Sequence, residues 1–225
     1  MKSELSNLQT LNDRMAELIR QKIVHGEFTP GQRLSEAALS ESLEISRNTL
    51  REVFRLLTKE GLLKHEPNRG VFVAIPSIAS IIDIYRVRRL IECQALAQAY
   101  PRHPAKKHLR DAVEMALRCR DADDWQGVGT ANMEFHMAIV ELADSERLNV
   151  MFSHLLAELR LAFGLLNDPE FLHMPYVEMN VNILELFEAG KLQEASAALN
   201  EYLVHSERIV LAVYARRISD GGQSR

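Results

Sequence analysis

The segment from Ser46 to Lys59, SRNTLREVFRLLTK, constrains the fold most, because it combines a helix start, an apolar seam and a row of arginines. Ser46 is a favourable N-cap, since its hydroxyl can accept a hydrogen bond from the first helical turn. Leu50, Val53 and Leu57 recur at helical spacing and need a partner that covers them. The arginines follow a neighbouring stripe and suit phosphate oxygens and base edges. The segment predicts a helix that lies on DNA, although an ordinary amphipathic helix with a solvated basic face has the same pattern.

Two shorter helical patterns precede this segment. The first includes Met15 to Ile23 and ends at Gly26, where residues 28–31, FTPG, prevent its continuation. The second includes residues 38–43, and only two residues separate it from Ser46. The second and third of these helices are joined by a turn of only a few residues. This arrangement predicts a helix-turn-helix unit.

A hairpin pattern follows the third helix. Residues 61–64 and 71–73 are short apolar runs, and residues 65–70, HEPNRG, form a turn between them. A hairpin in this place is a wing. We expect Arg69 and Gly70 at its tip to reach a minor groove or a phosphate.

These motifs together resemble the amino-terminal winged helix of GntR-type bacterial transcription regulators, over roughly residues 10–75. The resemblance is specific because it includes glycine, proline and arginine positions at fixed offsets: P30-G31, R33-L34, S46-R47, L50-R51-E52, G61-L62 and G70. It implies DNA contacts from the recognition helix and from the wing, at Ser46, Arg47, Asn48, Thr49, Arg51, Arg69 and Gly70. Ala37 and Ala38 depart from the family pattern, in which an arginine near there often contacts the DNA backbone. Arg33 is a candidate to supply that contact.

The charge distribution permits a DNA-binding function. The whole chain of 225 residues has a net charge of −4. Residues 1–78 hold 11 basic and 10 acidic side chains, whereas the remainder holds 16 basic and 21 acidic ones. The field that acts on phosphate is local, and a dimer would present two basic helices.

The composition also indicates the compartment. No apolar run approaches the roughly 20 residues that cross a bilayer, and the first ten residues are too polar for a signal peptide. Cys93 and Cys119 have no metal-ligand spacing, so we expect reduced thiols. These features predict a cytoplasmic protein without a membrane partner.

From residue 78 onward almost every segment has a helical period. Prolines, glycines and Asp/Asn clusters divide this part into six predicted helices, at residues 79–100, 105–121, 125–143, 147–166, 174–189 and 192–216. The predicted fold is therefore mainly α, with an N-terminal winged helix-turn-helix and small β wing followed by an all-α bundle. The predicted domains are residues 1–75 for DNA binding, a linker at 76–78, an effector-binding and dimerisation domain at 79–218, and a flexible tail at 219–225.

The second half resembles the effector-binding FCD domain of the FadR-like branch of GntR regulators. Residues 85–92, YRVRRLIE, are similar to its opening helix, residues 132–139 to a later one, and residues 180–203 to its closing pair. In that family one carboxylate and three histidines commonly hold a divalent metal. The matching positions here are Asn132, His136, Asn180 and Tyr202.

This set predicts no metal. Amide oxygens are weak donors and a phenol is protonated at neutral pH, so only His136 is a good ligand. Replacement ligands could come from His205, His154 or His173, which no spacing selects. His136 could also be a buried histidine with a structural partner.

The other interpretation of these residues is an effector site. Asn132, His136, Asn180 and Tyr202 would then bind the effector directly, with Arg88 as a partner for a carboxylate. The family resemblance implies a dimer that binds a palindromic operator and responds to a small metabolite, with organic acids as the usual effector class.

An alternative function is a helical-bundle metalloenzyme with an appended winged helix. A di-iron bundle needs paired Glu-x-x-His motifs on facing helices. The chain has one such motif, Glu170 to His173, between Pro169 and Pro175, where the sequence predicts that no long helix can run. No Gly-x-Ser-x-Gly turn exists to present a nucleophile. We therefore expect a regulator and no enzymatic activity.

Overall fold

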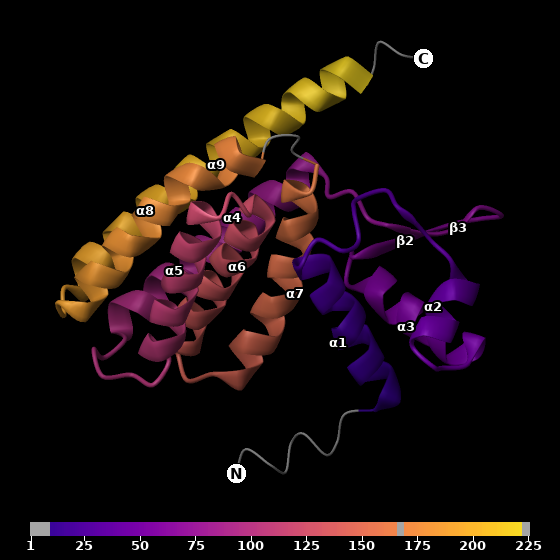
Figure 1. Cartoon of the computed structure of the whole chain (residues 1–225), viewed down its shortest axis with the longest axis horizontal. Helices are drawn as coiled ribbons and strands as arrows, with labels where there is room; N and C mark the ends of the chain where they lie inside the picture. The colour runs from indigo at the N-terminus through magenta and orange to yellow at the C-terminus, as the bar shows by residue number, and fades with distance from the viewer. Residues whose placement is uncertain (1–9, 166–168, 222–225) are drawn as a thin grey trace.

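The chain folds into a small winged helix and a larger helical bundle, which lie side by side in Figure 1. This computed structural model describes residues 10–165 and 169–221. The described part is mainly α-helical and has one three-stranded antiparallel sheet. The predicted fold class is confirmed.

The winged helix contains three helices and three short strands in its described part. These elements are α1 (Leu11–Val24), β1 (Arg33–Leu34), α2 (Glu36–Ser42), α3 (Arg47–Lys59), β2 (Leu63–Glu66) and β3 (Gly70–Val73). The sheet order is β1-β3-β2. The sequence did not predict β1, because a strand of two residues is too short to show a strand period. The strand forms because Arg33 and Leu34 pair with Phe72 and Val71 of β3.

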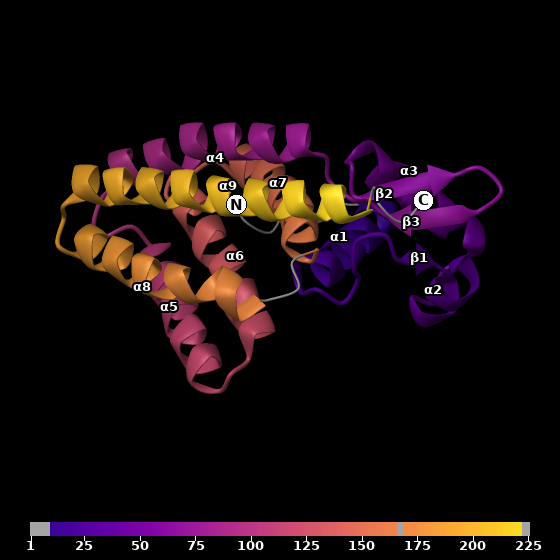
Figure 2. The same cartoon turned by 90° about the horizontal axis from the view of Figure 1, so that it is seen from above.

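The bundle contains six helices in its described part. They are α4 (Ile78–Gln98), α5 (Lys106–Asp121), α6 (Trp125–Glu141), α7 (Glu146–Phe163), α8 (Pro169–Glu188) and α9 (Leu192–Gly221). Helices α4 and α9 run along one side of the bundle, as Figure 2 shows. Ile78, which the sequence placed in the linker, is the first residue of α4 and follows the N-cap Ser77.

The start of α8 corrects one prediction. We expected the helix to begin at residue 174, but it begins at Pro169 and contains Pro175. The motif from Glu170 to His173 therefore does lie on a long helix. Burial of Leu172, Tyr176 and Val177 holds the segment helical despite the hydrogen bond that Pro175 cannot donate.

The end of α9 corrects a second prediction. The sequence placed a flexible tail at residues 219–225, whereas the helix continues through Gly221. The last four residues of that predicted tail, 222–225, lie outside the described residues. Local composition suggested the tail, because residues 219–225 include two glycines and no apolar side chain.

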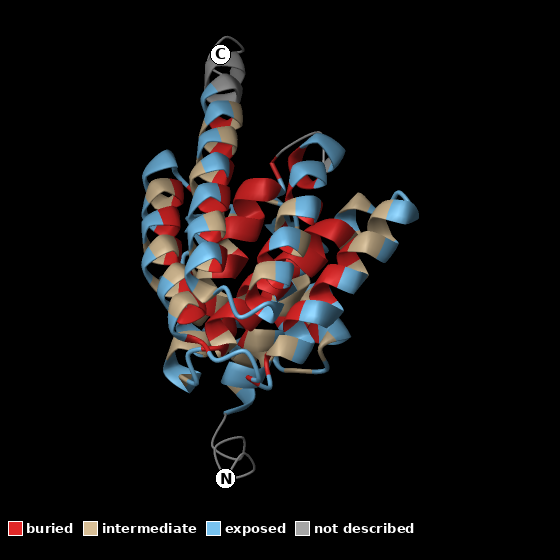
Figure 3. Ribbon diagram, turned by 90° about the vertical axis from the view of Figure 1, so that its left-hand side faces the viewer, coloured by how far each residue is buried: buried red, intermediate tan, exposed pale blue. Residues whose placement is uncertain are grey.

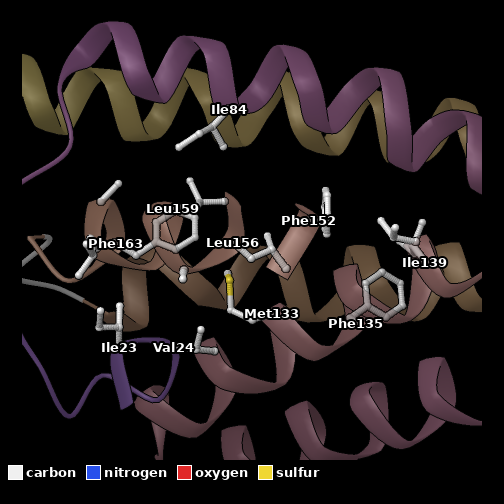
Figure 4. Packing of buried hydrophobic residues seen from close by; sticks show 14 of the residues in the cluster. Ile23, Val24, Ile84, Met133, Phe135, Ile139, Phe152, Leu156, Leu159 and Phe163 are labelled. Carbon is white, nitrogen blue, oxygen red and sulfur yellow. The ribbon is translucent and has the colours of Figure 1, made fainter. Parts of the chain in front are cut away.

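One apolar core continues from the bundle into the winged helix. In Figure 3 the buried residues lie on the inner faces of the bundle helices, while exposed residues lie on the outside. Figure 4 shows Ile23 and Val24 of α1 beside Met133 of α6 and Phe163 of α7. Helix α1 packs against both α3 and α7, so it connects the two parts of the molecule.

Candidate functional site

Helix α3 presents the predicted DNA-binding residues at its exposed start. Ser46 is the N-cap, and its hydroxyl accepts a hydrogen bond of 3.0 Å from the N–H of Thr49. The two hydroxyls also lie 2.8 Å apart. Arg47 and Asn48 are exposed, whereas Leu50 is buried against the rest of the winged helix. The helix therefore buries its apolar stripe and leaves polar groups on its outer face.

Arg51 has a partner that sequence reasoning missed. Its Nε donates to a carboxylate oxygen of Glu36 on α2 at 3.0 Å. Both side chains are partly exposed, so water screens the pair and it contributes little to stability. Glu36 therefore holds the guanidinium group of Arg51 toward α2.

The sheet brings Arg33 of β1 beside the hairpin of β2 and β3, whose turn carries Arg69. The guanidinium of Arg69 lies 5.5 Å from the ring centre of Phe72 and 2.5 Å from Glu66 Oε2. Gly70, with a φ of +106°, has a conformation that favours glycine, and a β-carbon there would lie 3.5 Å from Arg33 Nε. The pairing of β1 with β3 thus places Arg33 beside the tip residues.

Four predicted effector residues meet inside the bundle, and all four are at least 95% buried. The side-chain oxygen of Asn132 accepts hydrogen bonds from Asn180 at 2.8 Å and from Tyr202 at 2.9 Å. The His136 ring lies 5.0 Å from the Tyr202 ring. Burial strongly raises the pKa of Tyr202, so its hydroxyl stays protonated and donates.

Glu92 joins this group, which sequence analysis did not predict. Its Oε1 accepts a hydrogen bond of 2.7 Å from Arg88 Nε, and its Oε2 lies 2.5 Å from His136 Nδ1. All three side chains are at least 99% buried. We call Arg88, Glu92, Asn132, His136, Asn180 and Tyr202 the polar cluster. A signal for Glu92 was available, because residues four apart on a helix lie on one face.

The charges in the polar cluster are balanced. Burial would raise the pKa of Glu92, but Arg88 and His136 outweigh burial and lower it. Burial lowers the pKa of His136, so the imidazole is neutral near pH 7. A neutral imidazole beside a carboxylate carries its proton on Nδ1, which leaves a lone pair on Nε2.

Three buried polar atoms of the cluster have no hydrogen-bond partner in the described part of the chain. They are Arg88 Nη2, His136 Nε2 and Asn180 Oδ1. Arg88 Nη2 is a donor and Asn180 Oδ1 is an acceptor. His136 Nε2 is also an acceptor, because the neutral ring carries its proton on Nδ1. Buried polar groups normally have partners, so these three open positions make the cluster a candidate ligand site.

The cluster does not fit the metal that the family resemblance implies. His136 is oriented as a metal ligand, because Glu92 holds Nδ1 and leaves Nε2 open. Its neighbours are two amides and a protonated phenol, which are poor ligands for zinc. Across the described ranges, no group of three histidine, cysteine or acidic side chains could hold a metal ion.

The other histidines considered as replacement ligands lie in different surroundings. His205 lines a cavity with Phe171 and Met174, and its ring lies 6.0 Å from the Tyr176 ring. His154 lines a second cavity with Glu158. The ring of His173 lies 5.8 Å from the Phe163 ring. The structure assigns none of these three to the polar cluster.

None of the helices in the described ranges combines the length and the apolar character that a membrane span requires. This finding concerns residues 10–165 and 169–221 only.

Two protein families match the chain. Residues 11–73 match "Bacterial regulatory proteins, gntR family", and residues 83–205 match "FCD domain". The crystal structure of a GntR transcriptional regulator from Rhodococcus sp. RHA1 is 35% identical with a TM-score of 0.83, and covers 89% of this chain and 97% of that one. The fold of E. coli McbR/YncC is also similar, with a TM-score of 0.78 at 21% identity, covering 92% of this chain and 100% of that one.

Curated relatives include the repressor RspR of Escherichia coli K12, which is 26% identical over 152 residues. The match covers 65% of each chain. The Nta operon transcriptional regulator of Aminobacter aminovorans is 30% identical over 128 residues, or 54% of this chain and 58% of that protein. The matched part thus spans less than two thirds of these relatives.

Proposed function

Because the chain belongs to the GntR family of bacterial regulators and carries an FCD domain, we propose that it is a ligand-responsive transcription regulator. In this proposal it binds a palindromic DNA operator as a homodimer and changes its DNA affinity when a small metabolite binds in the bundle. The single observation that carries the proposal is the exposed polar start of α3 on a winged helix. Named relatives are regulators, which supports a regulatory role over an enzymatic one.

We assign the DNA contacts to two surfaces. Arg47, Asn48 and Arg51 are placed to reach base edges in a major groove, while Ser46 and Thr49 suit phosphate oxygens. Arg69, Gly70 and Arg33 belong to the wing and would contact the minor groove or the backbone. A symmetric dimer presents two such units, so its operator should be a palindrome.

We assign effector binding to the polar cluster, without a metal. The family's usual effectors are organic acids, and the open positions suit an acid that also bears a hydroxyl group. Its carboxylate would accept from Arg88 Nη2, and its hydroxyl would donate to the Nε2 lone pair of His136. The amide oxygen of Asn180 offers a second acceptor for a hydroxyl.

The closed cluster suggests how binding could affect DNA affinity. Every member is at least 95% buried, so a ligand can enter only if helices separate. Arg88 and Glu92 lie on α4, and only residues 74–77 separate that helix from β3 of the wing. A ligand that selects a different position of α4 would therefore shift the winged helix.

Operator selection tests the DNA proposal. Random double-stranded DNA is selected with the full chain, and fluorescence anisotropy then compares the parent with Arg47→Ala and Arg51→Ala on the recovered site. We expect palindromic sites and weaker binding by both variants. Equal affinity of parent and both variants would refute the assignment of α3, and recovery of asymmetric sites alone would refute the symmetric dimer.

A second experiment tests the effector proposal. Hydroxy acids are screened by thermal unfolding of the parent and of His136→Phe, which removes the Nε2 lone pair. We expect at least one acid to stabilise the parent and to do so less in the variant. Equal stabilisation of both proteins by every active compound would place the effector elsewhere.

A further inference from the structure

A further cavity, different from those beside His205 and His154, lies at the junction of the winged helix and the bundle. Its volume is about 190 Å³, and none of its lining residues belongs to the polar cluster. Gly26, Phe28 and Pro30 line it from the winged helix, while Arg160 and His173 line it from α7 and α8. Figure 4 shows Ile23 and Phe163, two other lining residues, in the core between α1 and α7.

Arg160 is the unusual residue in this cavity. Its side chain is buried, with a relative exposure of 8%, and within residues 10–165 and 169–221 no carboxylate forms an ion pair with it. Arg160 Nη2 donates a long hydrogen bond of 3.4 Å to the backbone oxygen of Gln126. Burial lowers the pKa of Arg160 to about 10, so the guanidinium group is still charged near pH 7.

Among the residues whose burial the structure describes, the other two buried arginines have acidic partners. Arg20 pairs with Glu60 at 3.0 Å, and Arg88 pairs with Glu92 at 2.7 Å. A buried charge is costly unless a charged or strongly polar partner compensates it. Arg20 and Arg88 thus each have a carboxylate that compensates their charge, whereas the charge of Arg160 has no such partner among the described residues.

Gly129 makes room for the guanidinium group, and Gly26 lies beside it. A β-carbon on Gly129 would overlap Arg160 Nη1 and would lie 2.7 Å from His173 Nε2, so both nitrogens face the same point. A β-carbon on Gly26 would lie 3.4 Å from Arg160 Nη2. The two ends of the fork therefore approach α6 on one side and the winged helix on the other.

His173 adds a neutral polar group to the site. It has a relative exposure of 4%, and burial together with Arg160 lowers its pKa to about 3. The imidazole therefore offers a hydrogen bond without a second positive charge. The rest of the lining is largely apolar and includes Phe28, Phe163 and Leu172.

We propose that this junction cavity binds a small organic monocarboxylate, with Arg160 as its ion-pair partner and His173 as a second hydrogen-bonding group. One uncompensated cation matches one negative charge, and the apolar lining suits a short hydrocarbon tail. The site is separate from the polar cluster, where Glu92 already neutralises Arg88. Because both parts of the molecule line the cavity, the bound acid would strengthen their contact and restrain the winged helix on the bundle.

Thermal unfolding of the full chain tests this site with sodium propionate as the probe. Sodium chloride and sodium phosphate at equal ionic strength are the comparisons. The variants are Arg160→Met, which removes the charge, and Arg118→Met, a matched control whose arginine has a side-chain exposure of 71% on α5. We expect propionate to stabilise the parent and Arg118→Met, and its apparent Kd for Arg160→Met to weaken about tenfold or more.

Gly129→Ala provides a second variant that keeps the arginine, but its β-carbon would overlap Arg160 Nη1 and crowd His173 Nε2, so both groups must leave their positions. It should lose the propionate response as well, and it decides the question if Arg160→Met does not fold. His136→Phe, which alters the polar cluster, should keep the response.

Several results would overturn the proposal. They are a parent that responds no more to propionate than to chloride, a stronger response to phosphate, and an undiminished response in Arg160→Met or in a folded Gly129→Ala. Loss of the response in His136→Phe alone would assign propionate to the polar cluster. That result would leave the operator experiment unaffected, so failure of this site is distinguishable from failure of the proposed function.

Discussion

Charged side chains are exposed on α3 and the wing, whereas they are buried in the polar cluster of the bundle. On α3 and the wing, Arg47 is exposed, and Arg51 and Arg69 have partly exposed carboxylate partners. In the bundle, Arg88 and Glu92 are almost completely buried and share a network with His136. Exposed groups act nearly independently, whereas a buried network responds as a unit. Substitutions should therefore have local effects in the first region and collective effects in the second.

We expect the largest effect from three substitutions that convert the polar cluster into a metal site. In the variant with Asn132→Asp, Asn180→His and Tyr202→His, three imidazoles and a carboxylate replace the natural donors. His136 already has its Nε2 open, and the other three side chains meet within 2.9 Å. Structural zinc sites have binding free energies of about 10 to 16 kcal/mol. We expect stoichiometric zinc in the variant and little metal in the natural protein.

Elemental analysis of both purified proteins checks this expectation. Tightly bound stoichiometric metal in the natural protein would contradict the proposal of a metal-free effector site. A folded variant that gains no zinc would show that these four residues do not converge in solution.

The next effect is expected from breaking the buried pair. Glu92→Ala leaves Arg88 charged and uncompensated in the core, which typically costs about 3 to 5 kcal/mol of unfolding free energy. Denaturant titration measures the loss. The double variant Arg88→Met with Glu92→Leu should recover most of it, because no buried charge remains. A loss below about 1 kcal/mol in Glu92→Ala would indicate that water reaches the cluster.

On the exposed side, Arg51→Ala should weaken operator binding by about 1 to 3 kcal/mol and leave stability nearly unchanged. Arg47→Ala should behave similarly. Arg118→Ala, an exposed arginine on α5, is the matched control for lost charge. Anisotropy titrations at one fixed salt concentration measure the effect, since salt alone changes DNA affinity. Equal losses in all three variants would mean that only net charge matters.

This contrast also explains what the sequence could predict. Surface motifs such as Ser46 and the arginines of α3 depend on local spacing, so the winged helix and its helix α3 were predictable. The convergence of Asn132, His136, Asn180 and Tyr202 followed from the family resemblance, and the structure brings them together.

The other features could not be predicted from the sequence, because they depend on packing between residues far apart in the chain. Glu92 became part of the cluster through His136, 44 residues away. Pro175 suggested a helix start, but burial of its neighbours extends α8 to Pro169. Arg160 and Gly26 meet only because α1 packs on α7, a contact that no local pattern encodes. The functional roles of all these residues stay predictions.

Acid should also lower the stability of the folded protein. The pKa values of His173 and His136 are lowered in the folded protein, so the unfolded chain binds more protons below its ordinary histidine pKa of about 6.5. Stability should be fully present above about pH 6.5 and should decrease as the pH falls toward 5, by at most about 1.4 kcal/mol per pH unit for each histidine. Denaturant titrations across this range measure the slope.

His173→Gln should reduce that slope, because it removes one of the two imidazoles whose lowered pKa values cause it. His65→Gln, at an exposed position of β2, is the matched control and should keep the slope of the parent. An unchanged slope in His173→Gln would argue against a neutral imidazole beside Arg160.

The smallest effect is expected at the surface pair between Glu36 and Arg51. Exposed ion pairs contribute about 0 to 1 kcal/mol, because water screens the charges and ordering both side chains costs entropy. Glu36→Gln should therefore change the unfolding free energy by less than about 1 kcal/mol. DNA binding should strengthen slightly, since Arg51 loses a competitor and a negative charge leaves the surface near phosphate. Anisotropy and denaturant titrations of the same preparation measure both quantities. A loss of DNA affinity in Glu36→Gln would instead show that Glu36 holds Arg51 in the geometry that DNA binding requires.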